Sequence, residues 1–91
     1  MSLVSSLVNK VKGGISKAKV IYYVTHIDKY FSKEQIAEAV KIFYQVWDGN
    51  IIASAKRFVE TAKTNPKIMK AEGNVNVGML IALFILSLIH I

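Results

Sequence analysis

The fold is decided by one stretch near the end of the sequence, Val77-Gly78-Met79-Leu80-Ile81-Ala82-Leu83-Phe84-Ile85-Leu86-Ser87-Leu88-Ile89-His90-Ile91. From Val75 onward no residue is charged, and only a few polar side chains interrupt the apolar ones. A helix that is apolar on every face must be buried. Residues 75–91 would span about 25 Å as a helix, slightly less than the ~30 Å hydrocarbon core of a bilayer. The sequence therefore predicts a helix that lies in lipid or among protein neighbours.

The composition predicts that this helix is covered by something outside a single subunit. A chain of 91 residues forms one small domain and buries only about 60–65% of the surface of its unfolded form. Yet 53% of its residues are apolar. Surplus apolar surface of this kind marks contact with partners. The side chains expected to be buried against other subunits or lipid are Val77, Leu80, Ile81, Phe84, Ile85 and Leu88.

The clearest helix start outside this segment is Ser32-Lys33-Glu34-Gln35, which fits a capping box. In that motif the Ser32 hydroxyl accepts from the Gln35 N–H, and the Gln35 side chain reaches back. The helix should run to about Trp47. Its buried stripe, from the helical spacing, comprises Ile36, Val40, Phe43 and Trp47, with Ala39 beside it.

A short turn, Asp48-Gly49-Asn50, follows this helix and predicts an antiparallel neighbour over 51–63. The apolar seam of the second helix comprises Ile52, Ala55, Val59 and Ala62. Asn65 as N-cap and Pro66 at the first helical position predict another short helix. Together these elements predict a helical hairpin.

The N-terminal part is also expected to be helical. Residues 2–12 place their apolar side chains on one face, and Gly13-Gly14 ends that pattern. Residues 15–30 are rich in β-branched and aromatic types, which allows a strand. Helical spacing and the lack of a partner strand favour a helix. The predicted fold is all-α, with a basic amphipathic segment at 1–31, the hairpin at 32–73 and the apolar helix at 74–91.

The strongest charge feature is a cluster of bases without nearby acids. The net charge is +6, and no acid precedes Asp28. A basic stripe of this kind can contact phosphates without reading sequence, or lipid headgroups. The alternative is an ordinary solvated face. The candidate contacts to nucleic acid or an anionic surface are Lys10, Lys12, Lys17 and Lys19.

Nothing in the sequence predicts an enzyme, a metal site or a cofactor. There is no cysteine, and the two histidines, His26 and His90, are far apart. No glycine-rich phosphate loop and no nucleophile paired with a base occurs. We therefore expect no catalytic residue, no metal ligand and no cofactor.

Residues 76–86, Asn-Val-Gly-Met-Leu-Ile-Ala-Leu-Phe-Ile-Leu, resemble the hydrophobic segments of coat proteins from spindle-shaped archaeal viruses. The cysteine-free composition, rich in Ile, Val, Lys and Tyr, is similar too. The resemblance implies a small helical protein that tiles a virion shell. Coat proteins of that family carry two apolar segments, whereas this sequence has one, preceded by a long charged region.

These observations predict a self-assembling structural subunit, a viral coat (capsid) protein that packs against many copies of itself in the virion. Genomic DNA, bound without sequence preference, and lipid are further candidate partners. The alternative is a tail-anchored membrane protein, because Lys67 and Lys70 precede the apolar segment and would keep the basic part in the cytoplasm. A DNA-binding module is a third option, but DNA binding requires no such apolar tail.

Overall fold

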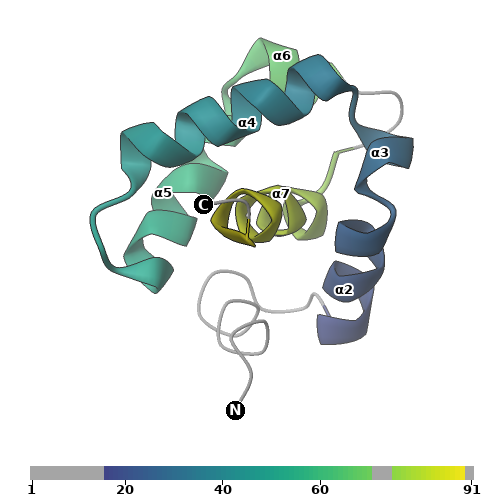
Figure 1. The fold of residues 1–91 in the computed structure, drawn as a ribbon, viewed down its shortest axis with the longest axis horizontal. Coiled ribbons are helices and arrows are strands. Elements are labelled where there is room, and N and C mark those ends of the chain that lie inside the picture. The colour runs from purple at the N-terminus through teal and green to yellow at the C-terminus, as the bar shows by residue number, and fades with distance from the viewer. Residues whose placement is uncertain (1–15, 71–74, 90–91) are drawn as a thin grey trace.

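A single apolar helix, α7 (Val77–Ile89), lies in the middle of the protein, as Figure 1 shows nearly end-on. The computed structural model describes residues 16–70 and 75–89. Helices α2 (Lys17–Thr25), α4 (Lys33–Val46) and α5 (Ile51–Lys63) make the most extensive contacts with α7, and the short α3 (Ile27–Tyr30) contacts it as well. Within the described residues every regular element is a helix, which confirms the all-α prediction. The predicted amphipathic helix over 2–12 lies outside these residues.

Residues 16–30, the described part of the segment 15–30, form two consecutive helices, α2 and the short α3 (Ile27–Tyr30). The Ser16 side chain accepts from the Lys19 N–H and so caps α2. His26 ends α2, and its backbone lies outside the helical region. The helical prediction for this β-branched, aromatic run is therefore confirmed, with a break that the sequence pattern did not indicate. Packing of Val20 and Tyr23 into the core outweighs the strand propensity.

Helix α4 begins at the predicted capping box. Ser32 accepts from the Gln35 N–H at 3.1 Å, and the Gln35 side chain accepts from the Ser32 N–H at 2.8 Å. Its buried stripe is rotated from the predicted one: Ile42 is 2% exposed, whereas Trp47 is 39% exposed and Val40 is half-buried. The helix ends at Val46, so Trp47 has extended backbone and leaves the helical face.

The turn after α4 carries the one positive φ among the described residues, Gly49 at 91°. Glycine adopts this conformation without strain. Asn50 then caps α5 by accepting from the Ala53 N–H. Helices α4 and α5 contact each other, and the short α6 (Pro66–Met69) contacts both. The antiparallel geometry of the hairpin stays a prediction.

The core of the molecule is built around α7. Every residue from 80 to 85 is 5% exposed or less, so the chain itself covers α7 on all faces over this length. The expectation that one subunit of this size cannot hide so apolar a helix is therefore wrong. The physical reason is that α2, α4 and α5 surround one central helix, and each packs against it. In residues 16–70 and 75–89, no helix is long and apolar enough to cross a membrane.

Candidate functional site

The predicted subunit-contact residues lie in the chain's own core. Leu80, Ile81, Phe84 and Ile85 are buried, and Val77 and Leu88 are half-buried. Their burial against neighbouring subunits or lipid therefore stays a prediction. The arrangement nonetheless brings all six side chains onto one short helix with no charged residue. The sequence indicated this helix, but not the three helices that cover it.

An aromatic cluster joins α7 to α4 and α5. The ring centroid of Phe84 lies 5.2 Å from that of Phe43 and 5.5 Å from that of Phe58. The Trp47 ring stacks on the Phe43 ring, and the two ring centroids are 5.3 Å apart. Aromatic pairs at these separations stabilise a core by about 0.5–1.5 kcal/mol beyond their burial. Sequence reasoning missed Phe58 in this cluster, although its spacing of three from Ala55 could have indicated it.

Few polar contacts hold α7 in place. Asn76 accepts from the Met79 N–H, and its Nδ2 donates to the Tyr23 hydroxyl at 3.1 Å. Ser87 donates to the Leu83 carbonyl oxygen in its own helix. Both ion pairs in the described part of the chain, Arg57–Asp48 and Lys67–Glu38, lie away from α7. Apolar burial is therefore the main force on this helix.

Two of the four predicted basic contacts are described, and both are exposed. Lys17 and Lys19 lie in the first turn of α2, where no acidic side chain accompanies them. Lys10 and Lys12 lie outside the described residues. The structure therefore brings together Lys17 and Lys19 alone, and phosphate or headgroup contact stays a prediction for all four.

A polar junction joins α4 to α6, and the sequence did not reveal it. Asn65 Nδ2 donates to Glu38 at 2.9 Å, and Gln35 Nε2 donates to the Lys67 carbonyl oxygen at 2.9 Å. A shallow groove follows these contacts, lined by Ser32, Glu34, Gln35, Ala37, Glu38, Lys41, Lys67 and Lys70. The lining contains both acids and bases, a mixture that suits a solvated surface better than an anion site. The sequence pattern did not indicate this junction because its contacts join residues about thirty positions apart.

A second polar cluster closes the α4–α5 turn. The Asn50 backbone N–H, Arg57 and Ser54 all contact the Asp48 carboxylate and hold its pKa below the ordinary value. Arg57 also donates to the Val46 carbonyl oxygen at the end of α4. These contacts fix the turn between α4 and α5. No group of three potential metal ligands occurs among the described His, Asp and Glu residues.

Comparison with known proteins gives one informative match. No protein-family profile matches the chain, and no solved structure matches it. Over 92 aligned residues the chain is 50% identical to the structural protein VP1 of Sulfolobus spindle-shape virus 1. The match covers 100% of this chain and 62% of that protein, so the chain spans under two thirds of its relative. The resemblance predicted from residues 76–86 is confirmed: the chain is a homologue of a structural protein from a spindle-shaped virus.

Proposed function

We propose that this chain is a self-assembling coat (capsid) subunit of a virion and packs against copies of itself through its hydrophobic helices. The observation that carries the proposal is the match at 50% identity over the whole chain to a viral structural protein. The all-α fold supports it, as does the presence of an apolar helix, α7, that carries no charged residue. A protein of this kind belongs in the virion.

We propose further that the basic N-terminal face contacts the genome or another anionic surface of the particle. Lys17 and Lys19 support this role because they are exposed and lack acidic neighbours on α2. Lysine neutralises phosphates as a point charge and does not read bases. Binding should therefore be independent of DNA sequence and strongly dependent on salt.

Electron microscopy of the purified chain in detergent-free buffer tests the coat proposal. We expect regular tubes, filaments or shells. Amorphous aggregate that detergent disperses into small uniform particles would argue against it. A chain that stays monomeric at every concentration would argue against it as well. The same grids with and without added duplex DNA show whether nucleic acid promotes the assembly.

A further inference from the structure

In the free chain, the apolar helix α7 is the element most able to drive assembly, and it is buried inside its own subunit. Residues 80–85 of α7 are 5% exposed or less, and α7 carries no charge on any face. Stable protein interfaces bury about 1,200–2,000 Å² and have an apolar centre. In this fold the largest apolar surface is used inside the subunit.

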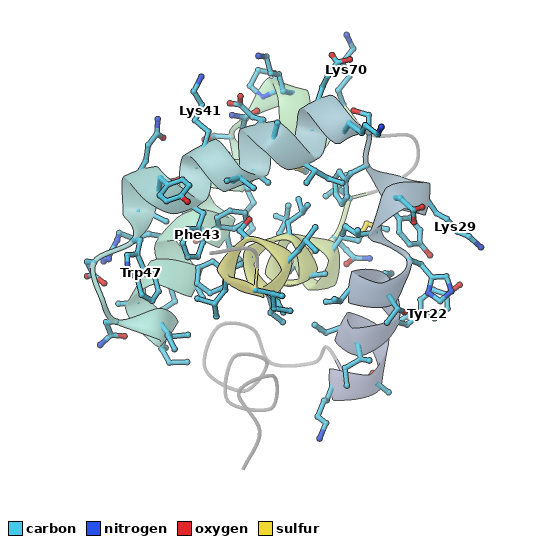
Figure 2. All side chains as sticks on the ribbon, in the orientation of Figure 1. Tyr22, Lys29, Lys41, Phe43, Trp47 and Lys70 are labelled. Carbon is cyan, nitrogen blue, oxygen red and sulfur yellow. The ribbon has the colours of Figure 1, made fainter. Side chains whose placement is uncertain are left out.

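The outer surface of the described part offers much less for self-association. Its exposed large hydrophobic residues are scattered over four helices and one helix cap, and Figure 2 shows Tyr22 and Trp47 on opposite sides of the molecule. The net charge of +6 makes copies of the chain repel each other. The exposed residues are Ile21, Tyr22, Tyr44, Trp47, Met69 and Ile89. Within residues 16–70 and 75–89, the exposed apolar side chains therefore form no continuous surface of the kind that a stable contact needs.

The contacts that hold α7 can form equally well between copies. Apolar burial is non-directional. The side-chain hydrogen bond that joins α7's N-terminal cap to α2 is Asn76–Tyr23, and neither described ion pair reaches α7. Residues 70–76 alone separate α6 from α7 in the sequence. Helix α7 can therefore exchange with the same helix of another copy, and each contact is regained.

Simple release of α7 would leave the other helices with exposed apolar faces. Val20, Phe43 and Phe58 are each 0% exposed and belong to α2, α4 and α5. Without α7 these three faces would lie open to water, which is strongly unfavourable. The site that α7 leaves must therefore be filled again, and the helix that fits it is α7 of another copy.

We propose that α7 is an exchange helix: in the free chain it fills the space between its own α2, α4 and α5, and in the assembly it fills the same space in a neighbouring copy. This inference rests on the proposed function, because it concerns how the coat subunit assembles. Exchange from each copy to the next is a head-to-tail contact, which builds closed rings or open filaments. The occupant of the site is a second copy of this chain.

A photo-crosslinker inside α7 distinguishes the two arrangements. Leu83 is fully buried, and Leu83→photo-leucine keeps its size and places a diazirine in the core. The full chain is irradiated before and after assembly, then separated on a denaturing gel and mapped by mass spectrometry. Ile85→photo-leucine is a second variant in case the first is unstable, and circular dichroism checks that both variants fold.

We expect links within one chain before assembly, and links from position 83 to α2, α4 or α5 of another chain afterwards. Particles that show only intrachain links would overturn the inference while leaving the coat function intact. Links from α7 to α7 of a neighbour, or to lipid when vesicles are added, would also overturn it. A chain that forms no particles would overturn the proposed function, and the inference with it.

Discussion

Phe84 is the residue whose loss should weaken the fold most. It is fully buried and contacts the rings of Phe43 and Phe58 from two different helices. We expect Phe84→Ala to lower the free energy of unfolding by about 3–5 kcal/mol, because it removes a large side chain and leaves a cavity. Urea unfolding followed by circular dichroism measures this. Ile89→Ala on the same helix is the control: at 67% exposure it should change the free energy by under about 0.5 kcal/mol.

The two buried serines should respond differently to substitution. Ser54 accepts from the Asp48 N–H and donates to the Asp48 carboxylate, so Ser54→Ala leaves both groups short of a partner. We expect a loss of about 1–2 kcal/mol. Ser87 donates to a carbonyl of its own helix, and alanine has the higher helix propensity, so Ser87→Ala should cost under about 0.5 kcal/mol. Equal thermal shifts in the two variants would contradict this assignment.

Asp48 should make stability depend on pH in the acid range. The Asn50 N–H, Arg57 and Ser54 favour its ionised form, so its pKa is lower in the folded chain than in the unfolded chain. The stabilisation is therefore complete above the unfolded pKa, about 4, and is lost as pH falls through the folded pKa. We expect Asp48→Asn to be less stable at neutral pH and to lose less stability between neutral pH and pH 3. Unfolding curves measured for both proteins at several pH values would show this. If the free energy of unfolding depended on pH equally in both proteins, the prediction would be contradicted.

At the scale of single elements, the capping box of α4 is open to a direct test. Ser32 accepts from the Gln35 N–H, and its own N–H donates to the Gln35 side chain. We expect Ser32→Ala to cost about 0.5–2 kcal/mol, because an N–H at the helix start loses its acceptor. Ser32→Asp keeps an acceptor at the same place and is the matched control. A melting temperature that falls equally for both variants would mean that the hydroxyl is not acting as a cap.

Helix starts could be predicted from the sequence because caps are local. The Ser32 box, the Asn50 turn and the Asn65–Pro66 pair all appear where the sequence indicated them. Buried faces were harder to predict. Val40 and Ile42 both fit a helical stripe on α4, and only the position of α7 decides that Ile42 is the buried one. The break at His26 and the α4–α6 junction depend on distant contacts, which periodicity does not contain.

At the scale of the whole molecule, the basic face should govern nucleic-acid binding. If Lys17 and Lys19 contact phosphates, replacing both with Gln should weaken DNA binding equally for all sequences. It should also reduce the slope of log affinity against log salt by up to about 2, since each contact contributes about 0.9. Filter binding at several salt concentrations measures this slope. Replacing Lys56 and Lys63 of α5 with Gln removes the same charge elsewhere, and an equal effect would show that only net charge matters.

The whole molecule also explains why composition misled the sequence argument. The apolar content exceeds what the core of an average small domain holds, and on that basis it predicts a surplus that one subunit cannot cover. Here one uncharged helix lies at the centre, and the amphipathic helices around it keep their Lys and Glu side chains outside, as Figure 2 shows for Lys29, Lys41 and Lys70. Because a central apolar helix must be buried on every side, each neighbouring helix packs apolar side chains against it. Composition records how much apolar surface exists, but not how it is distributed.

The stacked pair of Trp47 and Phe43 gives the molecule a built-in optical reporter. Trp47 is the sole tryptophan of the chain, and the ring beneath it, Phe43, also contacts Phe84 of α7. Any movement of α7 away from α4 changes what lies under the indole. Its emission wavelength and its quenching by iodide should therefore follow the departure and return of α7 in real time, without a label.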